Sequence, residues 1–235
     1  YQARKKMSLR GHAPAQRGVV LLGLLFAIIA TVAGILLTGW NTRQAVELRE
    51  ARTQKALQQA KEALIGYAAA YANAPGRLPC PEDETRIGTL LEGQAKGSCT
   101  TPPSRIGRLP WRTLKTGPLV DGSGESLWYV LSPGFSSAPI NHLTVGQLTV
   151  NGTANAAVAL IIAPGSPTGA QQRTEPSATN PPLAVDYLDL SNASNGPFVT
   201  TGPASAFNDR VSVLSANELF ATINRVVLAE VRGLD

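Results

Sequence analysis

The sequence predicts an α+β protein with a long N-terminal helix, a small and mostly antiparallel β-sheet, and a C-terminal helix. No proline occurs between Pro14 and Pro75, and most residues in that span are apolar or favour helices. After Pro75 the composition changes to Gly, Pro, Ser and Thr with short aliphatic runs, which is typical of short strands joined by turns.

The first part of the predicted helix is apolar on all sides. No charged residue lies between Arg17 and Arg43, and this span exceeds the roughly 30 Å of a bilayer core at about 1.5 Å per helical residue. Basic residues and no acidic ones precede it, which keeps the N-terminal side in the cytoplasm: Arg4, Lys5, Lys6, Arg10 and Arg17. We therefore expect residues 1–18 to be a basic cytoplasmic leader and residues 19–40 to cross the membrane once.

The second part of the helix, residues 41–73, is amphipathic. A cleaved secretory signal would have a shorter apolar core and a small-x-small cleavage site, whereas this chain continues without a break. Apolar residues recur at steps of three and four: Leu57, Ala60, Leu64, Tyr67, Ala68 and Tyr71. Polar residues occupy the other side: Arg52, Lys55, Gln58, Gln59 and Glu62. We expect this part to cover a soluble core.

Residues 74–235 form the predicted globular head. Strands are expected over residues 126–132, 143–150, 156–162, 184–190 and 210–214. The run "AAVALII" (156–162) reads as buried on both faces, and residues 164–182 as a long polar surface loop. A final helix is predicted to start at Ser215, which forms a capping box with Glu218.

The charge distribution argues against nucleic-acid binding. The formal net charge is +5, and the five basic residues of the leader account for all of it. The remaining basic residues balance the 16 acidic ones, so the rest of the chain lacks the basic stripe that a phosphate backbone requires.

Two cysteines, Cys80 and Cys99, lie beyond the apolar stretch. A pair in an exported, loop-rich segment predicts a disulfide, the alternative being two separate thiols. Closing this loop would contribute about 3 kcal/mol. With two cysteines and two histidines no zinc cluster can be assembled, and we expect neither a metal nor a cofactor.

The sequence offers little support for catalysis. No G-x-S-x-G elbow is present, "DGSGES" (121–126) is read as a Gly-rich turn, and His142 is the one histidine outside the leader. Four residues could supply side-chain oxygens to a calcium ion: Asp186, Asp189, Asn192 and Asn195. They lack the glycine and the terminal glutamate of an EF-hand loop, and polar residues of this kind are more often found in turns or at strand ends. The acidic run "CPEDE" (80–84) is expected to be solvated.

The basic leader ending in Gly18, the apolar helix and its amphipathic extension resemble the type IV pilins and the type II secretion pseudopilins. "GRLPCPEDE", "GRLPWRTL", "AAVALIIAPG" and "FNDRVSVL" look like segments of bacterial prepilin-like proteins with a one-disulfide head. The resemblance implies a pilin-like fold, cleavage by prepilin peptidase between Gly18 and Val19, and methylation of Val19. It also implies a single-pass inner-membrane protein with a periplasmic head. The helix 19–73 would pack against homologous subunits in a filament, and loops such as 164–183 would offer a partner-binding surface.

Two positions depart from the common pattern of this superfamily. Val19 stands at the first position after the predicted cut and Gly23 at the fifth, where the family usually has Phe and Glu. Some minor pseudopilins at a filament tip also lack this glutamate and have similar aliphatic residues after the glycine, so the resemblance favours a minor, initiating or tip-proximal subunit. The alternative is an uncleaved, signal-anchored envelope protein whose head binds a ligand or acts as an enzyme.

Overall fold

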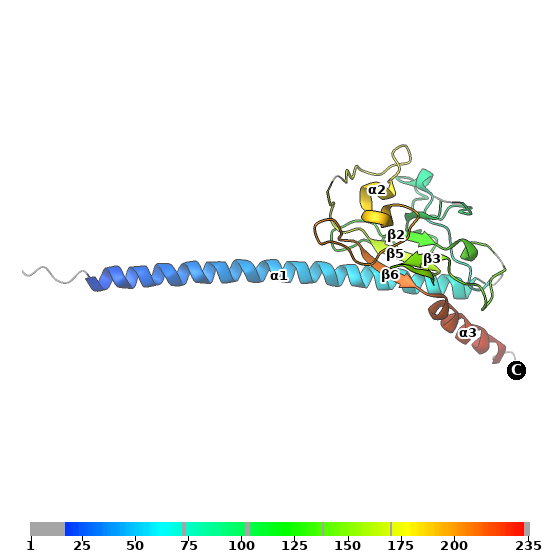
Figure 1. The fold of residues 1–235 in the computed structure, drawn as a ribbon, viewed down its shortest axis with the longest axis horizontal. Helices are drawn as coiled ribbons and strands as arrows, with labels where there is room; N and C mark the ends of the chain where they lie inside the picture. Colours follow the sequence, from blue (N-terminus) through cyan, green and yellow to red (C-terminus); the bar gives the residue numbers. More distant parts are fainter. Residues whose placement is uncertain (1–16, 72–73, 102–103, 138, 170, 233–235) are drawn as a thin grey trace, which may run out of the picture. The chain divides into compact units, whose positions relative to one another are not determined.

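The chain folds into helices and a small antiparallel sheet, as a computed structural model shows (Figure 1). The structure describes the backbone of residues 17–71, 74–101, 104–137, 139–169 and 171–232, and side chains there except in 17–20, 33–42 and 226–232. The helices are α1 (Arg17–Ala70), α2 (Ala184–Tyr187) and α3 (Ala216–Arg232), with short 3₁₀ helices at Glu84–Arg86, Pro133–Phe135 and Leu190–Ala193. The strands are β1 (Ile106–Arg108), β2 (Trp128–Leu131), β3 (Leu148–Val150), β4 (Thr153–Ala157), β5 (Ala159–Ala163) and β6 (Arg210–Leu214).

The chain divides into two compact units, Tyr1–Glu47 and Leu48–Asp235. The second unit contains a four-stranded antiparallel sheet in the order β1-β2-β5-β6 and a two-stranded sheet of β3 and β4. The predicted α+β class with a small antiparallel sheet is therefore confirmed, while the pilin-like arrangement stays a prediction.

One face of the four-stranded sheet packs against the C-terminal half of α1 and the start of α3. Side chains of a strand alternate between the two faces, and the inward set on this side includes Tyr129 and Ile161. They share a core with Leu57, Ala60 and Leu64 of α1. These α1 residues belong to the predicted apolar face, and the predicted polar residues on the other side, such as Arg52, are exposed.

The opposite face of the sheet is covered by β3, β4 and the segment around α2. Trp128 and Ile162 lie on this face and pack with Leu148, Tyr187 and Phe198. Because both faces are covered, β5 is fully buried along its length, which confirms the predicted burial for residues 159–162 of "AAVALII". Ala156 and Ala157 of that run belong to β4, and Ala156 is only partly buried.

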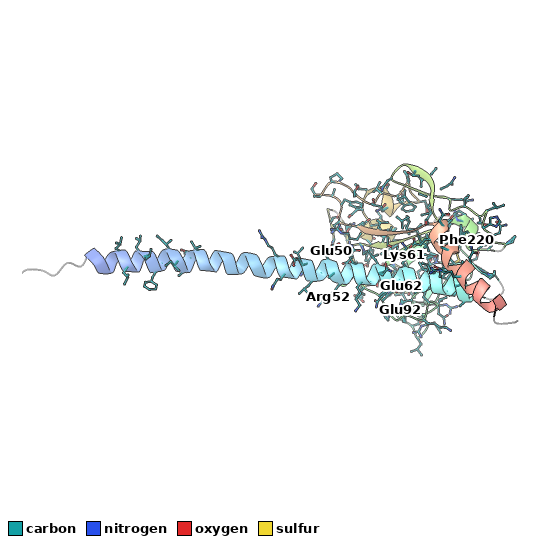
Figure 2. The ribbon with its side chains drawn as sticks, turned by 90° about the horizontal axis from the view of Figure 1, so that it is seen from below. Glu50, Arg52, Lys61, Glu62, Glu92 and Phe220 are labelled. Carbon is teal, nitrogen blue, oxygen red and sulfur yellow. A yellow bond between two sulfur atoms is a disulfide. The ribbon has the colours of Figure 1, made fainter. Side chains whose placement is uncertain are left out.

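Polar contacts also join α1 to the sheet unit. Glu50 pairs with Arg210 of β6 at 3.1 Å, and Figure 2 shows Glu50 and Arg52 on opposite sides of α1. The hydroxyl of Thr53 accepts a hydrogen bond of 2.9 Å from the backbone N–H of Gly122. A methyl group on Gly122 would lie 2.1 Å from the carbonyl oxygen of Arg49, so the turn approaches the helix as closely as a glycine permits.

Three of the predicted strands differ from the structure. The predicted strand 156–162 is divided at Val158 between the end of β4 and most of β5, which belong to different sheets. Residues 184–190 form α2 and the start of a 3₁₀ helix instead of a strand. The preceding Pro181 and Pro182 cannot donate to a strand ladder, and the N–H of Leu188 donates to the carbonyl oxygen of Ala184 at 2.8 Å, which closes a turn of helix instead of a bond to a neighbouring strand. Of residues 143–150 only Leu148–Val150 is a strand, since the N–H of Gln147 donates to the Ser132 hydroxyl instead of to a neighbouring strand.

The predicted C-terminal helix is present as α3. The Ser215 hydroxyl accepts a hydrogen bond from the N–H of Glu218 at 3.2 Å, as expected for the N-cap. The Glu218 carboxylate forms an ion pair with Lys61 of α1 at 2.7 Å. Glu218 therefore contributes its N–H to the N-cap of α3 and its carboxylate to a contact with α1.

Candidate functional site

The predicted leader junction falls at the start of α1. Gly18 and Val19 belong to this helix, but their side chains lie outside the described part of the structure. Just after them, the described side chains of residues 21–32 are all exposed, and most are large and apolar. Among the residues that the structure describes, no helix has both the length and the apolar character needed to span a bilayer.

The predicted disulfide joins Cys80 to Cys99 in the structure. Both cysteines are buried in the core that α1 shares with the sheet. The bond closes a loop that runs along the outer edge of β1, where the N–H of Glu82 donates to the carbonyl oxygen of Arg108 at 2.9 Å.

A groove of about 470 Å³ lies beside this edge, and we call it the β1 groove. Its floor is formed by Ile106, Arg108 and Trp128, and its opposite wall by the segment from Pro181 to Val185. Leu183 and Val185 expose more than half of their surface, so this wall presents apolar side chains to solvent. The volume is in the range of small-molecule and peptide pockets.

A buried ion pair between Glu82 and Arg108 lines the β1 groove. Glu82 is 2 % exposed, and its carboxylate lies 3.0 Å from Nε of Arg108 and accepts a 2.7 Å hydrogen bond from the N–H of Gly93. Burial raises the pKa of Glu82, although Arg108 and Gly93 oppose the shift. The prediction that "CPEDE" is a solvated acidic run was therefore wrong for Glu82, which is buried and pairs with Arg108; Arg108 also pairs with Glu92 at 3.0 Å.

The segment that follows the groove wall is held by a second buried polar group, Arg173. Its guanidinium pairs with Glu125 at 3.1 Å and donates to the carbonyl oxygens of Gly165 and Tyr187. It also lies over the Tyr187 ring, 5.0 Å from the centroid. The 164–182 loop, predicted to be a polar surface loop, thus has a buried anchor in its middle.

Two of the four residues considered for calcium meet in a third buried polar group. Asp189 and Asn192 share hydrogen bonds with Asp209: the N–H of Asp189 and the side-chain amide of Asn192 both donate to Asp209 Oδ2. Asn195 instead lines the β1 groove. Within the described residues no group of three or more His, Cys, Asp or Glu side chains is arranged to hold a metal ion.

The residues considered for catalysis lie in ordinary structural settings. His142 is exposed on the loop before β3. "DGSGES" is the predicted turn, in which the Asp121 carboxylate accepts hydrogen bonds from the N–H groups of Ser123 and Glu125. The sequence analysis did not identify Arg108, Arg173 or Asp209. Arg173 lies in the polar loop "AQQRTEPS" and Asp209 beside other polar residues in "FNDR", so their local sequence carries no signal of burial.

Comparison with protein families, curated proteins and solved structures finds no match to this chain.

Proposed function

We propose that the chain is a structural, non-enzymatic minor subunit of a type IV pilus-like or type II secretion filament. It is inserted in the bacterial inner membrane, processed by prepilin peptidase between Gly18 and Val19, and assembled through its N-terminal helix at an initiating or tip-proximal position. No cofactor is required, and the partners are other pilin or pseudopilin subunits.

The observation that carries the proposal is the division of α1 into two surfaces. Residues 21–32 expose apolar side chains all around the helix, whereas Leu57, Ala60 and Leu64 are buried in the head. An exposed apolar surface of this kind must be covered by lipid or by other proteins. In a subunit that moves from a bilayer into a bundle of helices, the same apolar side chains would first be covered by lipid and then by the neighbouring helices.

Intact-mass analysis of the protein from membranes tests the processing step. In cells that contain prepilin peptidase, the mass should correspond to a chain starting at Val19 with a methyl group. Gly18→Phe should block this cleavage, because the peptidase must accommodate the residue before the cut. Gly23→Ala is the matched control, since a methyl group there meets nothing within 4 Å, and it should be cleaved normally. An identical mass with and without the peptidase would overturn the proposal.

The β1 groove favours a second candidate, an uncleaved, signal-anchored envelope protein whose head binds a ligand. Its volume and its mixture of an apolar wall with the Glu82–Arg108 pair suit a small or peptide ligand. This candidate predicts a full-length protein that stays in the inner membrane and never purifies with filaments. Cell fractionation together with the mass measurement separates the two.

A further inference from the structure

The buried polar group around Asp209 joins parts of the head that are distant in sequence. We define the Asp209 cluster as Thr168, Gln171, Asp189, Asn192 and Asp209. These residues come from the 164–182 loop, from the 3₁₀ helix Leu190–Ala193 with the residue before it, and from the residue before β6. The three members Asp189, Asn192 and Asp209 are at most 3 % exposed.

The hydrogen bonds of the cluster are unequally shared between its two carboxylates. Asp189 accepts from the Thr168 hydroxyl at 2.5 Å, from the Gln171 amide at 2.9 Å and from the N–H of Asn208 at 2.7 Å. Asp209 accepts two bonds, both at Oδ2, from the N–H of Asp189 at 3.1 Å and from Asn192 at 2.9 Å. Its other oxygen, Oδ1, is buried and has no hydrogen-bond partner among the described residues.

The charged side chains around Asp209 do not neutralise it. Asp189, of like charge, lies in the same cluster. Arg173 lies close enough to favour the charged form, but its guanidinium is already bound to Glu125, Gly165 and Tyr187. The neighbouring strand β5 has no ionisable residue over Ala159–Ala163. A buried carboxylate without a cation or enough donors is destabilising, so the protonated acid is the form that suits this position.

Asn192 connects the cluster to the segment beyond it. Its side chain accepts from the N–H of Val199 at 2.8 Å and donates to the Val199 carbonyl oxygen at 3.0 Å. Residues 193–195, which line the β1 groove, lie between these contacts in the chain. The cluster therefore ties the segment that contains residues 193–195 to Asp209, the residue before β6.

We propose that the Asp209 cluster holds residues 189–199 against the rest of the head at low pH and releases them at higher pH. With Asp209 protonated, residues 189–199 are held in place and residues 193–195 line the β1 groove. When Asp209 ionises beside Asp189, the segment opens and the carboxylate reaches water. The direction of its pKa agrees: burial raises the pKa of Asp209 to about 7, against the smaller opposing effects of Asn192 and the Asp189 N–H. The proposal concerns the head and does not depend on leader cleavage or filament assembly.

Hydrogen–deuterium exchange on the full chain in detergent micelles tests the proposal. After correction for the intrinsic pH dependence of exchange, the protection of amides 189–199 should fall at least tenfold between pH 5 and pH 8. A shift from the ordinary value of 3.8 to about 7 sets a ceiling of about a hundredfold for this change. At pH 8 these amides should also exchange faster than those of β2. Protection that is equal at both pH values would overturn the proposal.

Two variants make the test specific. Asp209→Asn keeps an acceptor for Asp189 and Asn192 and supplies an N–H₂ where the acid carries its proton, so its protection should be independent of pH within twofold. Asp186→Asn makes the same chemical change on α2, outside the cluster, and should respond like the wild type. A full pH response in Asp209→Asn would refute the role of Asp209. If this variant fails to fold, the ¹³C shift of the Asp209 carboxyl in the wild type decides: a midpoint near 7 supports the proposal, and one below 5 overturns it.

Discussion

Replacing Gly122 with alanine should force the 121–126 turn away from α1 at a close backbone contact. The added methyl group would lie 2.1 Å from the carbonyl oxygen of Arg49 and 2.6 Å from its carbon, so the turn must retreat by about 1 Å. Overpacking of this kind costs about 1–3 kcal/mol, and losing the Gly122 N–H bond to Thr53 costs about 1 kcal/mol more. We therefore expect the free energy of unfolding to fall by about 2–4 kcal/mol.

Urea unfolding of the full chain in mild detergent, followed by circular dichroism, measures this loss. Gly97→Ala is the matched control, because a methyl group there meets nothing within 4 Å; it should change stability by less than about 0.5 kcal/mol. Thr53→Val removes the hydrogen bond without a clash and should cost about 1 kcal/mol. If Gly122→Ala were as stable as Gly97→Ala, the close approach of turn and helix would be refuted.

Three further predictions concern the head. Replacing Cys80 and Cys99 together with serine should lower the free energy of unfolding by about 3 kcal/mol, because the bond closes a loop with a sequence separation of 19; a loss below about 1 kcal/mol in urea would contradict this. The Asp209 pKa is raised to about 7 from 3.8, so its contribution is fully present below pH 4 and lost as pH rises to 7. The wild type should accordingly lose stability on the order of 4 kcal/mol over that window in thermal or urea unfolding, and Asp209→Asn should not. Arg108→Met should cost about 3–5 kcal/mol by leaving Glu82 buried and unpaired, and adding Glu82→Gln should restore much of it; no rescue in the double variant would exclude the charge as the cause.

The sequence predicted buried surfaces best where apolar residues recur at a regular spacing or in an unbroken run. The three- and four-residue spacing of Leu57, Ala60 and Leu64 identified the buried face of α1, and the unbroken aliphatic run of β5 identified a strand covered on both faces. These patterns depend only on neighbours along the chain, so they can be read without knowing the fold.

The polar interior could not be predicted in the same way. Glu82 is acidic and lies in an acidic run, and only the fold places Arg108 against it. Asp189 and Asp209 are separated by 20 residues, and nothing in their local sequence indicates that they share hydrogen bonds. The strand predicted at 184–190 failed for a related reason, because Asp189 is buried by its bonds to Thr168, Gln171 and Asn208 instead of pointing to solvent from a strand.

The disulfide-closed loop has a consequence for how the head would aggregate. An edge strand presents free N–H and C=O groups to other chains, and here the N–H of Glu82 occupies the carbonyl oxygen of Arg108 on the outer edge of β1. Reducing the Cys80–Cys99 bond would release the segment that shields this edge before the sheet itself melts. Under reducing conditions the head should therefore self-associate through β1, and light scattering should rise while most of the secondary structure persists.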